Sequence, residues 1–299
     1  MEPTKRSEVP RDQRPAIKIR RFESQLGQDT PIDWADNNPV STQFLNAIST
    51  FFPGVEHYAL ESVNKALGQI SNPILRREAR IFAGQESVHS QEHDDFNHWQ
   101  DQHGLKLTRL TAINEKAFSK ISRYSSIRVN LARIVAVEHL FAVVGHALLT
   151  NQEILSRMHP DVRPMWIWHA IEEIEHKAVA FDVYQAVSGS YWLRVLIFFE
   201  VLVTIPLWIM TLHLVLLFKT RQLLNWRSHI GFLYRLIGSG FLSQVEWGQL
   251  DYLRRDFHPW QTDDRQVLAD AFVQIEANLE VSKIATANSS LVAIEAVPA

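Results

Sequence analysis

Apolar residues recur along the chain at helical spacing, and no segment alternates apolar and polar positions as a strand does. Two helix starts have an asparagine followed by proline at the first helical position, Asn38-Pro39 and Asn72-Pro73. The pattern predicts helices that begin near residue 38 and that span about 73–99, 126–150 and 164–187. The Asn-Gly and Asp-Gly dipeptides typical of tight hairpins are missing from the sequence. We therefore predict an all-α protein.

The segment between the second and third predicted helices, roughly 100–125, is longer than a hairpin in a helical bundle needs. One long crossover is typical of ferritin-like bundles, whereas up-down-up-down bundles have short loops throughout. We expect a ferritin-like four-helix bundle with additional C-terminal helices, one of them long and strongly apolar.

That apolar segment, 195–218, has only Glu200 and His213 as ionisable groups. As a helix it would reach about 36 Å, against about 30 Å of bilayer hydrocarbon. Aromatic and basic residues flank both of its ends, as membrane anchors would: Tyr191, Trp192 and Arg194 before it, Lys219, Arg221 and Trp226 after it. Two interpretations stay open, membrane insertion or close association on the one hand and a buried helix kinked at Pro206 on the other. Glu200 and Pro206 both argue against a simple span.

The two ends of the chain differ from the helical middle. Residues 1–22 are rich in lysine and arginine and have no apolar run, so they form no secretory signal, and we predict a mostly disordered basic arm. We expect the metal-binding bundle over 23–188, apolar and C-terminal helices packed on the bundle or on the membrane over 189–283, and a flexible tail over 284–299. A cytoplasmic location, with association with the cytoplasmic membrane through 195–218, fits this layout.

Composition narrows the chemistry. The 30 Lys and Arg residues nearly balance the 33 Asp and Glu residues, so we expect no nucleic-acid partner. The chain has no cysteine, which excludes disulfides, thiolate zinc sites, iron–sulfur clusters and cysteine nucleophiles. Any metal must be held by nitrogen and oxygen atoms. The chain has 13 histidines, and nine of them lie between His89 and His176.

Two Glu-x-x-His pairs stand out among these histidines, Glu86 with His89 and Glu173 with His176. Each lies within a predicted helix, where residues three apart point from the same face and offer a carboxylate and an imidazole to one ion. Dinuclear carboxylate bundles need such a pair from each of two helices and a single glutamate from each of the other two. The pairs therefore indicate a site for two divalent metal ions.

Single glutamates are available on the other two helices. Glu138 lies in a strongly apolar stretch, where a carboxylate without a partner would cost several kcal/mol of desolvation. The first helix offers Glu56, just after the Pro53-Gly54 break, and Glu61, which points from another face. We prefer Glu56 and leave Glu61 as the alternative.

A seventh ligand candidate, His169, lies four residues before Glu173 and seven before His176, on the same stripe of the fourth helix. The alternative for His169 is a histidine packed beside the neighbouring tryptophans. For His93 we favour a supporting or surface role over ligation. We expect Glu172 and Glu175 to face solvent or to pair with Lys177, and His139 to point away from Glu138. The predicted metal ligands are Glu56, Glu86, His89, Glu138, His169, Glu173 and His176.

At these residues the chain resembles a bacterial family of the ferritin-like superfamily, the predicted metal-dependent hydrolases. The similar stretches are 17–22, 51–56, 84–93, 137–142, 168–184 and 257–260. The resemblance implies a dinuclear metal site and favours Glu56 over Glu61, although Val55 separates Gly54 from Glu56 where the family tends to have Pro-x-Gly-Glu. The order of His169, Glu173 and His176 is also similar to that in the di-iron p-aminobenzoate N-oxygenase.

Three functions are compatible with these features. The first is a dinuclear non-haem enzyme, of the di-iron type, that oxidises or oxygenates a hydrophobic small-molecule substrate with O2. The second is a hydrolase that uses a metal-activated water. The third is a non-catalytic metal-binding protein associated with a membrane. Iron is the expected metal and manganese the alternative, because both use these ligands. A homodimer stays open.

Overall fold

The computed structural model describes residues 8–22, 24 and 26–276. The described residues form an all-α protein in which the only β-type pairing is an isolated bridge between Ala35 and Met158. The labelled helices are α1 (Pro39–Ala66), α2 (Pro73–Gln102), α3 (Leu107–Tyr124), α4 (Ile127–Thr150), α5 (Gln152–Ser156), α6 (Arg163–His176), α7 (Val179–Val187), α8 (Tyr191–Lys219), α9 (Trp226–Gly238) and α10 (Phe241–Leu250). Residues 265–276 are helical as well. Short 3-10 turns lie at Arg11–Gln13, Leu67–Gln69, Asp251–Leu253 and Pro259–Gln261.

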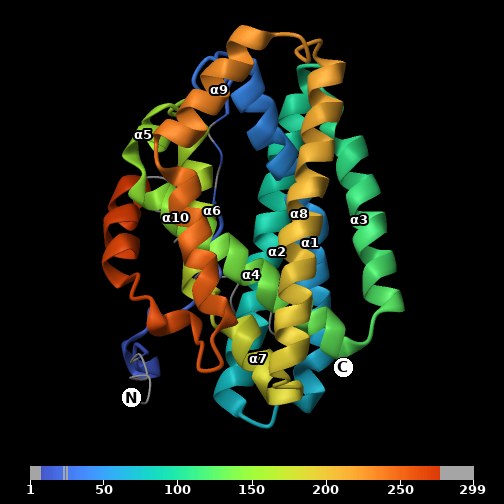
Figure 1. The fold of residues 1–299 in the computed structure, drawn as a ribbon, viewed down its shortest axis with the longest axis vertical. Helices are drawn as coiled ribbons and strands as arrows, with labels where there is room; N and C mark the ends of the chain where they lie inside the picture. Colours follow the sequence, from blue (N-terminus) through green and yellow to red (C-terminus); the bar gives the residue numbers. More distant parts are fainter. Residues whose placement is uncertain (1–7, 23, 25, 277–299) are drawn as a thin grey trace.

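The core of the molecule lies between four stretches of helix, α1, α2, α4 and α6 with its continuation α7 (Figure 1). The predicted starts of α1 and α2 are confirmed, because the side chains of Asn38 and Asn72 each accept hydrogen bonds from two backbone N–H groups of the first helical turn. Helix α8 packs across α1 and α4, and α9 and α10 follow on the same side of the molecule.

Three local features differ from the predicted pattern. The crossover between α2 and α4 contains the helix α3, which packs against α1. The predicted helix 164–187 is interrupted after His176, where the buried ammonium group of Lys177 donates to the backbone oxygen of Thr262 and pairs with Asp264. Helix α1 runs through the Pro53-Gly54 pair without a break.

The prediction that the N-terminal segment is a disordered arm is wrong for residues 8–22, the part of the segment that the structure describes. Val9 and Phe22 are buried, and the Phe22 ring stacks on Trp168 of α6. The guanidinium group of Arg20 reaches Glu172 and Glu175 of α6, and Arg11 pairs with Glu78 of α2. Buried partners therefore fix this basic segment on the bundle. Residues 1–7 and the predicted tail 284–299 lie outside the described residues.

Helix α8 is buried on one face only. Ile197, Phe198, Val201, Ile205, Leu212 and Leu216 lie in the core, whereas Trp192, Leu196, Phe199, Val203, Leu207, Met210, Leu214 and Phe218 are exposed. Glu200 accepts two hydrogen bonds from Arg133 of α4, at 3.1 and 2.9 Å. By length and composition, both α4 and α8 are apolar enough to cross a membrane, yet α4 is mostly buried in the core and α8 mostly exposed.

Candidate metal centre

Four helices bring the seven predicted ligands together in the core. Glu56 comes from α1, Glu86 and His89 come from α2, Glu138 comes from α4, and His169, Glu173 and His176 come from α6. All seven are buried, with at most 4% of each residue exposed. The helical spacing of three, four and seven residues places each set on the inner face of its helix, as predicted.

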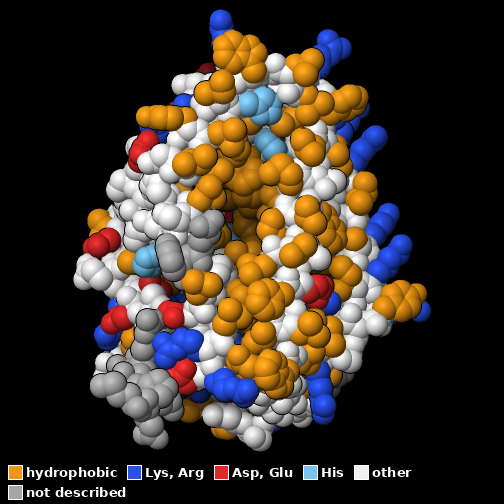
Figure 2. Space-filling model, viewed as in Figure 1, with side chains coloured by type: hydrophobic (Ala, Val, Ile, Leu, Met, Phe, Trp, Pro, Cys, Tyr) orange, Lys and Arg blue, Asp and Glu red, His pale blue; other side chains and the backbone are white. Residues whose placement is uncertain are grey.

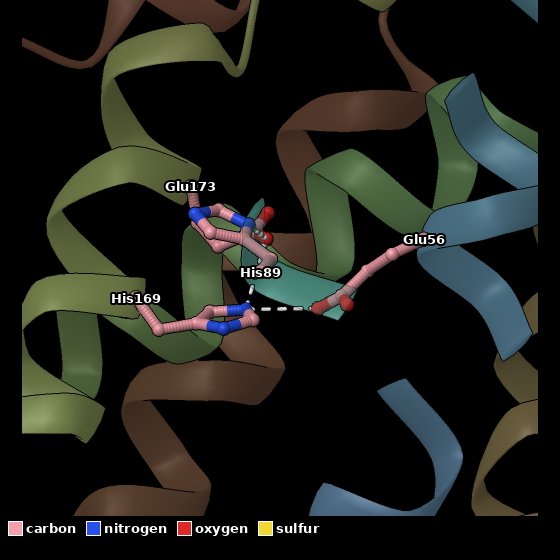
Figure 3. A group of neighbouring side chains, drawn as sticks. All are labelled: Glu56, His89, His169 and Glu173. Atoms are coloured by element: carbon pink, nitrogen blue, oxygen red, sulfur yellow. Dashed lines mark ion pairs between the residues drawn. The ribbon is translucent and has the colours of Figure 1, made fainter. Parts of the chain in front are cut away.

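Four of these side chains form a first group, Glu56, His89, His169 and Glu173, whose potential ligand atoms all lie within 4.8 Å of one another. Figure 3 shows them pointing toward one another from α1, α2 and α6. The Nε2 atom of His169 lies 3.0 Å from Glu173 Oε1 and 3.7 Å from Glu56 Oε1.

A second group, Glu86, His89, Glu173 and His176, meets the same distance limit and shares His89 and Glu173 with the first. Glu138 lies beside it, with Oε2 at 3.0 Å from His176 Nδ1, and Glu86 Oε1 lies 3.1 Å from His176 Nε2. The two adjacent groups have two residues in common, and each of them could hold a metal ion.

The donor atoms of the centre are buried and make no well-oriented hydrogen bond in the described part of the chain, although three N–O pairs among them lie only 3.0–3.1 Å apart. Among them are both carboxylate oxygens of Glu56 and Glu173, Oε1 of Glu86, Oε2 of Glu138, Nδ1 of His89, Nε2 of His169 and both ring nitrogens of His176. Buried polar atoms are rarely left unpaired, because each one costs about 1–3 kcal/mol. Oxygen and imidazole donors that face one another in this way fit a divalent metal ion.

The electrostatics of the centre also favour a bound cation. Burial and the neighbouring carboxylates raise the pKa of Glu56 and Glu86 well above the usual range, and burial with Glu173 nearby raises the pKa of Glu138 to about 7. Burial alone would lower the pKa of His89, but Glu172 and Glu173 outweigh it and raise that pKa to about 10. Without a cation, these shifts favour protons on Glu56, Glu86 and Glu138, where a metal ion would neutralise the carboxylates, whereas the nearby histidines lower the pKa of Glu173.

The prediction that Glu172 and Glu175 face solvent or pair with Lys177 is wrong. Both are buried, and both accept hydrogen bonds from Arg20, at 3.0 Å for Glu172 and 2.6 Å for Glu175. Glu172 also lies 3.1 Å from His89 Nε2 and accepts a hydrogen bond from the indole of Trp168. Because Glu172 engages Nε2, the Nδ1 atom of His89 is left facing the centre.

The surface alternative for His93 is also wrong, because this histidine is buried. Its Nε2 lies 2.9 Å from Nδ1 of His169, and its Nδ1 lies 2.9 Å from the hydroxyl of Ser49. His93 therefore holds the ring of His169 by Nδ1, while Nε2 of His169 faces Glu56 and Glu173. This is the supporting role, one of the two roles predicted from the sequence.

The remaining candidates lie elsewhere. Glu61 is partly exposed and accepts hydrogen bonds from Lys65 and from the buried Ser122, and it belongs to neither of the two groups. His139 points away from Glu138, as expected, and its ring lies 4.8 Å from that of Tyr252.

Sequence reasoning missed Arg20 and the roles of Glu172 and Glu175. A usable signal was present, because apolar residues lie all around α6, among them Trp166, Trp168, Ile171 and Ile174. A helix that is apolar all round is buried on every side, so its charged residues need buried partners.

The fold and the centre thus define an all-α protein with a buried glutamate and histidine cluster that is able to hold metal ions. Residues 18–263 match the family of predicted metal-dependent hydrolases, and the chain belongs to that family. No curated protein and no solved structure matches the chain.

Proposed function

We propose that the protein is a dinuclear non-haem metal enzyme built on a ferritin-like four-helix bundle, in which α1, α2, α4 and α6 each supply ligands. The observation that carries the proposal is the pair of buried donor groups that share His89 and Glu173. Glu56 and His169 would hold one ion, and Glu86, Glu138 and His176 the other, with the shared residues within reach of both. Iron is the metal that we expect, with manganese as the alternative.

An apolar approach to the centre supports a hydrophobic substrate. On α1, Phe44, Ile48, Phe52 and Glu56 follow one another at four-residue intervals and so form one stripe. Exposure falls along this stripe, from half-buried Phe44 and Ile48 to Phe52 at 7% and Glu56 at 1%. Figure 2 shows a hollow lined by hydrophobic side chains on the face formed by α8, α9 and α10.

The two ends of the stripe connect the surface with the centre. The ring of Phe44 packs against His213 of α8 and Phe232 of α9, with centroids 5.6 and 5.3 Å apart. At the inner end, the ring of Phe52 stacks on His169 at 4.4 Å and touches Phe141 at 5.2 Å. Aromatic side chains therefore cover the ligands on the side from which a substrate would come.

This lining favours oxidation with O2 over hydrolysis. Iron in such a site supplies the redox chemistry by which O2 is activated. The protein residues contribute the rest, because Phe52 and Phe141 exclude water from the substrate side while Glu172 and His93 hold two of the imidazoles in place. Oxygen and an apolar substrate both enter such a lining readily, whereas hydrolysis needs water there.

Hydrolysis is the second candidate, because the family to which the chain belongs is described as metal-dependent hydrolases. In that case the same residues would hold ions that activate a water molecule.

The experiment that separates the functions starts from purified full-length protein made metal-free and reloaded with Fe(II) under anaerobic conditions. Substrate-dependent O2 consumption with long-chain apolar compounds would support the proposal. Anaerobic cleavage of esters that is lost on chelation, and that returns with Mn(II) or Zn(II), would instead establish a hydrolase. Stoichiometric metal binding with neither reaction would leave a metal-binding protein without activity.

A further inference from the structure

Exposed apolar side chains of α8 and α9 form one large surface, which we call the apolar face. On α8 these are the exposed residues named above, and on α9 they are Trp226, Ile230, Leu233, Tyr234 and Ile237. Leu223 and Leu224 in the intervening turn are exposed as well. Figure 2 shows hydrophobic side chains over most of this side of the molecule. Soluble monomers rarely expose apolar patches of this extent, so the face indicates an interaction site.

Helix α8 cannot cross a bilayer while it keeps its place in the protein. Its inner face packs on α1 and α4, and the indole of Trp208 donates a 2.9 Å hydrogen bond to Asn114 of α3 and stacks on Phe118 at 4.8 Å. A span would thus bring α3 into the hydrocarbon, where its exposed Lys116 and Lys120 would be costly. Only the exposed side of α8 is available to lipid.

Positive charge borders the apolar face. Helix α3 and its N-cap expose a series of basic side chains: Lys106, Arg109, Lys116, Lys120 and Arg123. The only acidic residue of α3 is Glu115. Lysine and arginine side chains follow the edge of the molecule beside the apolar face in Figure 2. At one end of α8, the guanidinium of Arg255 lies over the rings of Tyr191 and Trp192.

We propose that the apolar face docks on the surface of a bilayer that contains anionic lipid, with α8 lying in the interface and not across it. Trp192 near the start of α8 and Trp226 at the start of α9 are of the type that settles at the headgroup level. The basic side chains of α3 then meet the acidic headgroups. The hollow seen in Figure 2 opens on the same face, so an apolar substrate dissolved in lipid would reach it directly. This role in substrate entry rests on the proposed function. Docking itself requires no metal.

Vesicle binding tests the docking surface. The full-length protein should co-sediment with vesicles of phosphatidylcholine and phosphatidylglycerol, and less with phosphatidylcholine alone or at high salt. Leu207→Glu should weaken binding about tenfold or more, because a carboxylate replaces a leucine that is 62% exposed on α8. The matched control is Ile74→Glu, the same kind of change at a similarly exposed residue on α2, and it should bind as the parent does.

The absence of cysteine makes the orientation measurable with single labels. A nitroxide label is attached to a single cysteine in each of three variants, Trp192→Cys, Leu207→Cys and Phe218→Cys. Collisional quenching should place all three labels at a similar shallow depth in the bilayer. A deep label at Leu207 with the end labels on opposite sides of the bilayer would overturn the interfacial orientation. Metal content and the circular dichroism spectrum of each variant show separately that the bundle and its centre are intact.

A second copy of the chain is the competing occupant of the apolar face. If sedimentation without lipid gives a dimer that Leu207→Glu converts to monomer, and vesicles bind the parent and the variant equally, the docking proposal is wrong. A monomer without lipid, together with binding that Leu207→Glu reduces, supports it. The outcome is independent of the proposed function, because metal-free protein should bind vesicles as well as metal-loaded protein does.

Discussion

Glu138 is the residue at which the candidate centre is most directly tested. It is the only carboxylate that α4 brings to the centre, and its Oε2 atom lies 3.0 Å from His176. Glu138→Ala should therefore lower the amount of metal bound per chain from about two ions to one or fewer, if the centre is dinuclear as we propose. Elemental analysis of the purified variant measures this.

Glu61→Ala provides the control for this measurement, because Glu61 pairs with Lys65 at the surface of α1. It should retain the metal content of the parent protein. Equal metal content in Glu138→Ala and the parent would show that the ligand assignment on α4 is wrong.

Glu172 and Glu175 allow a second contrast between neighbouring carboxylates. Both accept hydrogen bonds from Arg20, but only Glu172 also contacts a predicted ligand, His89. Glu172→Gln should weaken metal affinity about 10- to 100-fold, as is typical when a carboxylate behind a metal-binding imidazole is lost. Glu175→Gln should have a much smaller effect. Competition with a chromophoric chelator measures both, and equal affinities would contradict the role of Glu172.

Helical spacing was sufficient to predict which glutamates and histidines share a face, and the structure brings all seven together. Spacing could not reveal the partners of Glu172, because Arg20 is 152 residues away in sequence and approaches only after the N-terminal segment has packed on α6. Side chains that orient a ligand from another element are therefore the part of such a site that local pattern does not predict.

At the scale of a single helix, α1 continues through Pro53 because other helices satisfy its backbone. Proline has no N–H group, so the carbonyl of Ser49, four residues earlier, loses its helical partner. The side-chain amide of Asn97 on α2 donates to that carbonyl at 3.1 Å. Gly54 allows α3 to approach, because a Cβ atom there would lie 3.0 Å from Phe118 and 3.1 Å from the backbone of α3.

This arrangement predicts that the effects of Asn97 and Pro53 on stability are coupled. Asn97→Ala should lower the free energy of unfolding by about 1–3 kcal/mol, because the buried carbonyl of Ser49 is left without a donor. In a Pro53→Ala background, Asn97→Ala should lower the free energy of unfolding by less, because the backbone N–H of residue 53 then donates to the carbonyl of Ser49. Urea unfolding of the two single variants and the double variant gives the coupling, and strict additivity would contradict it.

The same helices show which of their features could be predicted from the sequence. The Asn-Pro starts at Asn38 and Asn72 are strictly local signals, and both mark helix starts in the structure. The continuity of α1 and the break after His176 depend on Asn97 and Asp264, which belong to distant parts of the chain. Hydrophobic pattern alone therefore placed the main helices but not their interruptions, and it did not predict α3.

At the scale of the whole molecule, the protein must hold the four glutamates and three histidines of the candidate centre in its core. Such groups are expensive to bury unless they are paired, protonated or bound to a cation. The folded metal-free protein therefore gains stability from protons on Glu56, Glu86, Glu138 and His89, whose pKa values are all raised.

The stability of metal-free protein should consequently fall as the pH rises from about 6.5 to 8.5. The stability that comes from protonated Glu138 is complete below its unfolded pKa of 4.5 and is lost as the pH rises through its folded pKa of about 7. The stability that comes from protonated His89 is lost as the pH rises from its unfolded pKa of 6.5 to its folded pKa of about 10. His169 acts in the opposite direction, because burial and the nearby His89 lower its pKa to about 4, but its effect ends near pH 6.5. Metal-loaded protein should lack this decline, since the cation replaces the protons. Thermal unfolding of both forms across this range measures the difference, and parallel curves would show that no cation neutralises these carboxylates.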